Sequence, residues 1–234
     1  MRQTNPDVVT QKRDGMTRVH VSAYAVGHFS NDLYITFIYF YLAWFLGKVG
    51  GVSSTVVAWC ALSGQVADGI MTGLVGFASD KVNTRFGKRM PFYYIGFLLV
   101  TPSIFLLFFN PSFVQDVEKN ADDDKSLNFR DWWFLIAHGI FEFAWAGCQI
   151  SHLSIVNQLS ASNRMRDRLV NLRNGFTYAA NFTVLGLAFV FFRLVEDPIT
   201  QFRLLSGSAV LLGTITSVYF MAVINEPKLT AEAK

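Results

Sequence analysis

Charged side chains are scarce in this sequence of 234 residues. Asp, Glu, Lys and Arg together make up 16% of it, whereas about a quarter is usual in a soluble globular domain. Cysteine is scarcer still: Cys60 and Cys148 both fall in apolar stretches, which leaves no disulfide framework. The sequence has no phosphate-binding glycine loop and no convincing nucleophile–base pair, so we expect no enzymatic activity. No filter-like stretch supports a channel.

Apolar side chains take the place of the missing charges. They make up 52% of the sequence, and 23 residues are phenylalanine, a composition typical of membrane proteins. Six apolar stretches are each long enough to cross a hydrocarbon core as a helix of about twenty residues. These predicted spans cover residues 21–46, 54–76, 92–109, 132–155, 174–194 and 204–224, between a polar tail at 1–20 and a second tail at 225–234. We therefore expect an all-α, polytopic membrane bundle.

The basic residues predict which side of the membrane each loop faces. Fourteen of the 20 Lys and Arg residues fall in the two tails and in the loops after the second and fourth spans. Because cytoplasmic loops carry an excess of Lys and Arg, we expect both termini in the cytoplasm, or in the matrix if the membrane is mitochondrial. The opposite side carries the acidic loop 110–131. An endolysosomal membrane and the mitochondrial inner membrane both fit this pattern.

Polar side chains recur at helical spacing inside four of the spans. Such side chains are costly at membrane depth and usually face a cavity or the bundle interior. We expect a polar pathway near the midplane; the alternative is that these side chains pair with one another and only fix helix packing. His138 and Glu142 have the i, i+4 spacing of metal ligands, but there is no evident third ligand, so we expect no metal site. The candidate pathway residues are His28, Asp32, Asp68, Glu142, Gln149 and Asn181.

A short basic loop follows the second span. Within residues 64–91, the apolar helix that carries Asp68 runs directly into a segment of alternating polar and basic residues. We expect this loop to act as a cytoplasmic gate, with Asp80 pairing either with Arg85 or with a neighbouring helix N-terminus. The candidate gate residues are Asp80, Lys81, Arg85, Gly87, Lys88 and Arg89, together with Arg168 and Arg173 near the start of the fifth span.

Three stretches carry a resemblance to a known family. The stretch from Gly64 to Pro91 is similar in its loop to the major facilitator superfamily pattern G-x-x-x-D-[RK]-x-G-[RK]-[RK], with the longer spacing of the glycoside–pentoside–hexuronide cation symporters such as melibiose permease. Residues 24–32 resemble the opening helix of those symporters. Residues 149–181 resemble the end of their fourth span, the following loop and the start of the fifth. The residues of these three stretches are most similar to those of the eukaryotic branch that includes the lysosomal and melanosomal cysteine importer.

The resemblance implies solute transport coupled to Na⁺ or H⁺, with no other cofactor. The family's cation site uses carboxylates on the first, second and fourth spans, and Asp32 and Asp68 match two such positions. Gly64 stands where bacterial symporters often have a further acid, and Gln149 stands where they have the acid of the fourth span. A proton carried on Asp68 or Asp32 is therefore a simpler expectation than a sodium site.

The resemblance also implies a partner for this bundle. The superfamily builds a transporter from two six-helix halves, each made of two inverted three-helix repeats. Three interpretations stay open: the N-terminal half of a cation-coupled transporter of a small polar organic solute, a symmetric dimer, or a non-transporting structural subunit of a larger membrane complex. We expect lipid around the bundle, a second half or other membrane subunits on its polar face, and no nucleic-acid partner.

Overall fold

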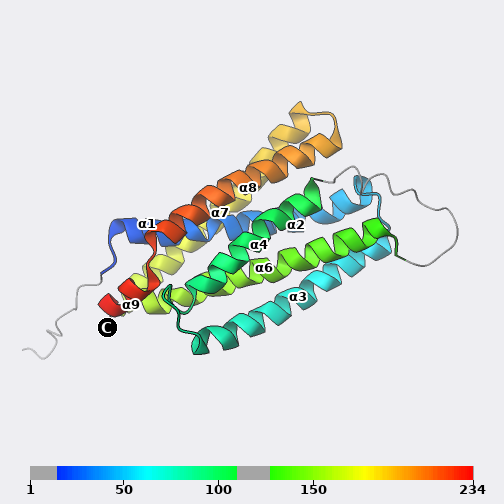
Figure 1. Ribbon diagram of the computed structural model, residues 1–234. Helices are drawn as coiled ribbons and strands as arrows, with labels where there is room; N and C mark the ends of the chain where they lie inside the picture. Colours follow the sequence, from blue (N-terminus) through cyan, green and yellow to red (C-terminus); the bar gives the residue numbers. More distant parts are fainter. Residues whose placement is uncertain (1–14, 110–126, 234) are drawn as a thin grey trace, which may run out of the picture.

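The computed structural model describes residues 15–109 and 127–233 (Figure 1). Most of the expected polar tail and most of the expected acidic loop lie outside these residues. The described chain is helical, apart from turns and one isolated bridge between Thr84 and Gly87. Its helices are α1 (Arg18–Gly27), α2 (Phe29–Lys48), α3 (Ser54–Lys81), α4 (Met90–Phe108), α6 (Phe129–Leu159), α7 (Asn163–Leu194), α8 (Pro198–Val223) and α9 (Glu226–Ala233).

Each predicted span corresponds to a helix, but the bounds differ. The helix predicted at 174–194 begins eleven residues earlier, at Asn163, because the side chain of Ser162 caps it by accepting a hydrogen bond from the Met165 amide. The tail predicted at 225–234 contains the short helix α9. Both extensions are polar, so apolar stretches alone did not mark them.

The first predicted span is broken at His28, between α1 and α2. Side chains from neighbouring helices supply hydrogen bonds to the carbonyl groups around the break. The Tyr93 hydroxyl donates to Gly27 at 2.8 Å, the Trp145 indole donates to Asn31 at 3.0 Å, and His152 Nε2 donates to Tyr24 at 3.0 Å. These bonds keep the broken backbone satisfied inside the bundle.

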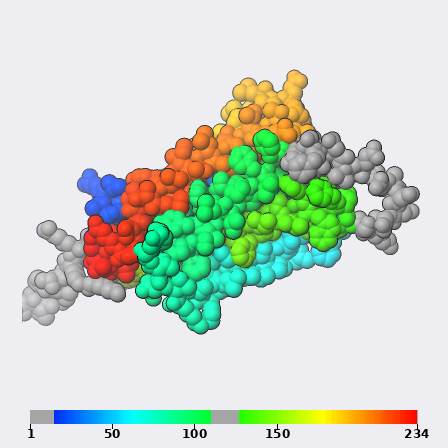
Figure 2. Space-filling model, in the orientation of Figure 1, coloured from blue at the N-terminus to red at the C-terminus, as the bar shows by residue number. Residues whose placement is uncertain are grey.

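The helices pack in two groups. Helices α3 and α4 pack against α6, whereas α7 and α8 pack against α1 and α2. The contact between α4 and α8 joins the groups, and these two helices lie side by side across the face seen in Figure 2. Helix α9 packs against the end of α6 (Figure 1). Loops of the expected gate and α9 therefore share one end of the bundle.

Phenylalanine fills the interior where the two groups meet. The rings of Phe37 and Phe108 stack with centroids 4.1 Å apart, and both contact Phe202. All three side chains are fully buried. Aromatic rings supply large contact areas to such a core, which explains the abundance of phenylalanine in a chain with so little charge.

Large apolar side chains also cover the outside. Leu98 on α4 and Phe182 and Phe189 on α7 are each about two-thirds to three-quarters exposed, at 69%, 74% and 68%. Apolar surface on this scale marks contact with lipid or another membrane protein. Helices α4, α7 and α8 are long and apolar enough to cross a membrane, with mean hydropathy of 1.8, 1.6 and 1.6. Helices α2, α3 and α6 have 20, 28 and 31 residues and carry three of the four polar stripes; the fourth lies on α7.

Candidate functional site

A polar cluster lies just beyond the break in the first span. We define the central polar cluster as His28, Asp32, Gln149, Arg173 and Thr177, which share a pocket of about 370 Å³ between α2, α6 and α7. His28 Nε2 lies 3.5 Å from one oxygen of Asp32, and the Thr177 hydroxyl donates to the other at 2.7 Å. One carboxylate is therefore held from two helices, which fixes its position beside the pocket.

Several polar atoms of this cluster have no hydrogen-bond partner. They are buried His28 Nδ1, Gln149 Oε1 and Arg173 Nε. Buried donors and acceptors are costly when unpaired. The Arg173 guanidinium also donates to Asn174 at 2.6 Å, so the pocket is lined by a cationic group together with the polar side chains of His28, Asp32 and Gln149.

The structure places Arg173 in this cluster and away from the gate loop. Four residues separate Arg173 from Thr177, so both side chains lie on the same face of α7, which faces Asp32. The sequence analysis assigned Arg173 to the gate because a basic loop precedes it in the sequence. Arg168 is exposed on the same helix and does not line the pocket. Of the two gate candidates at the start of α7, Arg173 thus lies in the cluster and Arg168 on the surface.

Two other pathway candidates lie apart from the cluster. Asn181 accepts a hydrogen bond from the Thr36 hydroxyl at 2.5 Å, one turn beyond Thr177 along α7. Asp68 is half-buried on α3, where it accepts a hydrogen bond from Thr72 at 3.3 Å. Asp68 lies one turn from Gly64, which packs against α6, and so sits near the edge of the α3 face that meets α6.

Glu142 forms a second buried site with His138. The two side chains are 3% and 4% exposed, and His138 Nε2 lies 3.3 Å from a Glu142 oxygen. His138 Nδ1 bonds the carbonyl oxygen of Cys60 at 2.7 Å. Gly64 of α3 leaves room for both, since a Cβ there would lie 2.8 Å from Glu142 Cγ. Gly64, which stands where related symporters often have an acid, here serves close packing of α3 against α6.

In the expected gate loop, Asp80 forms an ion pair with Arg89 and not with Arg85. Asp80 accepts a hydrogen bond from Arg89 at 2.6 Å, and Arg89 also bonds the Ser79 hydroxyl. Arg85, the predicted partner, lies over the ring of Phe86 at 4.6 Å. Asp80 is 72% exposed, so the pair contributes little stability in its own right. Lys81 lies over the Phe77 ring at 3.8 Å.

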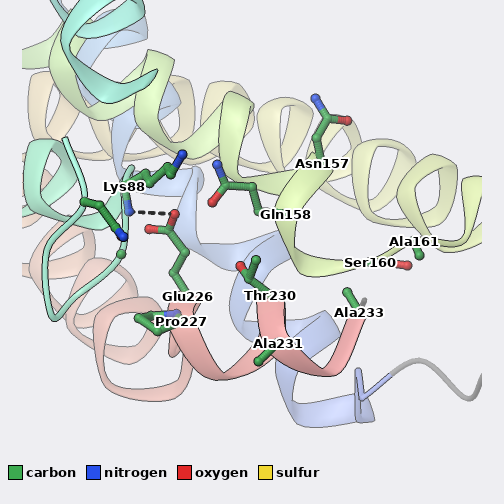
Figure 3. Close-up of a pocket in the computed structure, with 12 residues that line it drawn as sticks. Lys88, Asn157, Gln158, Ser160, Ala161, Glu226, Pro227, Thr230, Ala231 and Ala233 are labelled. Atoms are coloured by element: carbon green, nitrogen blue, oxygen red, sulfur yellow. Dashed lines mark hydrogen bonds between the residues drawn. The ribbon is translucent and has the colours of Figure 1, made fainter. Parts of the chain in front are cut away.

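Glu226, which our sequence analysis did not select, holds the other side of this loop. It is 1% exposed, and its carboxylate accepts hydrogen bonds from the backbone amides of Lys88, Arg89 and Met90, each at 2.9 Å; Figure 3 shows the one from Lys88. These are amides at the start of α4, where the helix dipole favours a negative charge. The one sequence signal that could have identified Glu226 is its position as a lone acid beside Pro227, directly after the last apolar stretch.

Gly87 makes this contact possible. Its φ is 105°, a conformation that L side chains rarely adopt, and a Cβ there would collide with the Glu226 carboxylate. The same loop, α9 and the end of α6 surround a pocket of about 700 Å³ (Figure 3). Lys88, Asn157, Gln158 and Thr230 give it polar walls. No group of three or more His, Cys, Asp or Glu side chains is arranged to hold a metal ion within residues 15–109 and 127–233.

Buried polar sites inside a helical bundle with an apolar exterior mark an integral membrane protein of the polytopic α-helical class. The model of the MFS/sugar transport protein family matches residues 23–233, and the chain belongs to that family. This confirms the resemblance drawn from the stretch 64–91 and its two companion stretches.

Individual relatives agree with this assignment. Major facilitator superfamily domain-containing protein 12 of Equus caballus is 33% identical over 222 residues, which cover 85% of this chain and 44% of that protein. The Homo sapiens protein of the same name is 35% identical over 179 residues, which cover 74% of this chain and 35% of that protein. An uncharacterized symporter of Synechocystis is 24% identical over 159 residues, covering 66% and 27%. The chain spans less than half the length of these relatives.

Proposed function

We propose that this chain forms the N-terminal half of a major facilitator transporter and moves a small polar organic solute by alternating access. The observation that carries the proposal is the pocket of about 370 Å³ between α2, α6 and α7, with its unpartnered polar atoms. An interior that served only packing would pair these atoms with one another, because unpaired buried groups are costly. Family membership supports the same reading.

The arrangement around the pocket fits a six-span half with both termini on the cytoplasmic side. The Asp80–Arg89 pair and Glu226 lie at the end of the bundle that carries most of its basic residues, as expected for a cytoplasmic gate. Half-exposed Asp68 and the apolar surface of α3 would contact the second half. The two packing groups do not coincide with the two sequential repeats, spans one to three and spans four to six. Helices α3 and α4, which are the second and third spans, pack against α6, which is the fourth. Helices of one repeat thus pack against the other repeat, as in interlocked repeats.

We further propose that a cation couples to transport through Asp32 or Asp68. Asp32 lies beside the solute pocket and touches His28, so a proton there would change the charge that the solute meets. Asp68 lies on the surface where a second half would close. Each carboxylate accepts a hydrogen bond from a threonine hydroxyl, Asp68 from Thr72 of its own helix and Asp32 from Thr177 of the facing helix. Protons or Na⁺ would reach both through the cavity between the two halves.

The test begins with uptake in cells that express the chain alone or together with the C-terminal half of its human relative. A panel of radiolabelled sugars, amino acids and organic ions would be screened against empty cells. For a transported solute, Arg173→Gln should reduce uptake at least tenfold, since it removes a charged pocket group. Arg193→Gln, at an exposed position in the last turn of the same helix, should leave uptake unchanged.

Equal losses in the two arginine variants would remove the pocket from the mechanism. If no solute is taken up, either by the chain alone or by the chain together with the C-terminal half, the proposed function as a whole is contradicted. In a positive screen, Asp32→Asn and Asp68→Asn would be compared with and without a proton or sodium gradient. The coupling residue is the one whose loss abolishes gradient-driven accumulation but preserves exchange at equal concentrations. Intact accumulation in both variants would refute coupling through these carboxylates.

A further inference from the structure

A buried arginine without a partner lies at the opposite end of the bundle from the gate. Arg130, in the first turn of α6, is 8% exposed, and its Nε has no hydrogen-bond partner. No carboxylate of the described chain lies within ion-pair distance of its guanidinium, since the ion pairs found there join other residues. A buried charge without a counter-charge is strongly unfavourable. Arg130 therefore needs an anion that the described chain does not supply.

The surroundings of Arg130 favour an anion. It lines a pocket of about 220 Å³, together with Gly51, Ser53, Asn128 and Asp131 among others. The pocket lies between the N-termini of α3 and α6, which begin at Ser54 and Phe129. Both helix dipoles present their positive ends there. The last turn of α2 also lines this space through Gly47 and turns a negative dipole end toward it. Two helix N-termini and a guanidinium outweigh that one C-terminus.

The loop between α2 and α3 leaves this space open. Gly51 has φ of 65°, and a Cβ at that position would lie 3.3 Å from Arg130 Nη1. A side chain larger than glycine would be strained there and would press on the guanidinium. Glycine therefore allows the loop backbone to pass under Arg130 while the pocket stays unfilled.

Asp131 is the one acid among the residues that line the pocket, and it is already engaged. Its carboxylate accepts a hydrogen bond from the Asn128 amide at 3.2 Å, and the Asn128 side chain accepts one from the Asp131 amide at 3.0 Å. This reciprocal cap stabilises the start of α6. Asp131 offsets part of the positive field but leaves the guanidinium of Arg130 without a hydrogen-bonded partner.

We propose that Arg130 and the N-termini of α3 and α6 form a binding site for a phosphate oxyanion. The planar guanidinium matches the paired oxygens of a phosphate group, and the pocket has room for one such group. The phosphate can come from a phospholipid headgroup or from free inorganic phosphate. Phe129 and Trp132 are 55% and 53% exposed beside Arg130, as is typical of residues at headgroup depth.

The two sources are distinguished by thermal unfolding of the purified chain in detergent that contains no phosphate. One arm adds sodium phosphate against sodium chloride at equal ionic strength. The other adds phosphatidylglycerol against diacylglycerol, which lacks the phosphate group. Wild-type protein should unfold at a higher temperature with phosphate in at least one arm. A response only to phosphatidylglycerol identifies a lipid site, and a response to sodium phosphate identifies a soluble anion.

Variants then locate the response. Arg130→Gln should abolish it, whereas Arg193→Gln, an exposed arginine in the last turn of α7 at the same end of the bundle, should retain it in full. Arg130→Lys keeps the charge but loses the planar fork, so its half-saturating phosphate concentration should rise about tenfold. If Arg130→Gln does not fold, Arg130→Lys takes its place as the test of the site. No response in wild type, or an undiminished response in a folded Arg130 variant, would overturn the proposal.

Discussion

Glu226 gives the sharpest test of how the end of the bundle that carries α9 and the loop between α3 and α4 is held together. Its carboxylate accepts hydrogen bonds from three successive backbone amides at the start of α4 while being 1% exposed. Glu226→Gln keeps the size of the side chain but removes its charge, and it turns one acceptor into a donor that faces other donors. The expected result is a less stable chain with a frayed first turn of α4.

The size of the effect follows from the contacts that are lost. A helix N-cap typically contributes about 1 kcal/mol, and hydrogen bonds to a charged group contribute about 1.5–3 kcal/mol each, with incomplete additivity. Some of the exposed loop will rehydrate, so we expect a loss of about 2–4 kcal/mol in the free energy of unfolding. For a chain of this length that corresponds to a Tm lower by about 4–16 °C.

The two buried cysteines provide the assay. Cys60 and Cys148 are 0% and 4% exposed and carry free thiols, so a dye that becomes fluorescent on thiol reaction reports unfolding as each thiol is uncovered. Glu232→Gln, the same change at an exposed position of α9, is the matched control. A Glu226→Gln melting curve that coincides with wild type, or an equal shift in Glu232→Gln, would refute the reasoning.

Two further predictions concern packing and pH. Gly96→Ala would place a methyl group 2.7 Å from the Ala144 carbonyl oxygen and 2.8 Å from the Cys148 amide, so we expect the free energy of unfolding to fall by about 1–3 kcal/mol. In Gly69→Ala, where nothing lies within 4 Å, it should rise by up to about 1 kcal/mol; equal effects in the two variants would contradict the assigned packing of α4 on α6. Asp197 caps α8, and hydrogen bonds from the side chain and amide of Thr200 lower the pKa of its carboxyl below the ordinary value. The stabilisation is thus present at neutral pH and lost as pH falls through the lowered pKa, so the Tm difference between wild type and Asp197→Ala should close in strongly acidic buffer, and a gap that widens there would exclude this cause.

The helical architecture could be predicted from the sequence because hydropathy reports helices that must bury their own backbone groups. Family membership could be predicted because the stretch 64–91 combines glycine, acid and paired basic residues in a specific order. The break at His28 was not predicted, since an apolar run gives no local signal when the carbonyl partners are Tyr93, Trp145 and His152, far away in sequence.

The candidate sites were predicted less completely. Helical spacing identified His28 and Asp32 as neighbours, and the structure adds Arg173 and Thr177 from α7. Spacing within one helix does not show which neighbouring helix a residue faces. Arg173 was therefore assigned to the gate from its place beside the basic loop. Glu226 was missed for the same reason, because its partners are backbone amides that any sequence offers.

The three side-chain hydrogen bonds at the break in the first span have a mechanical consequence. An unbroken helix bends only by giving up bonds of its own ladder, whereas α1 and α2 are already separate rods joined at His28. Their angle can change by lengthening the bonds from Tyr93, Trp145 and His152. Helices α4 and α6 supply these donors, so any change of angle between α1 and α2 would be opposed directly by the helices packed beside them.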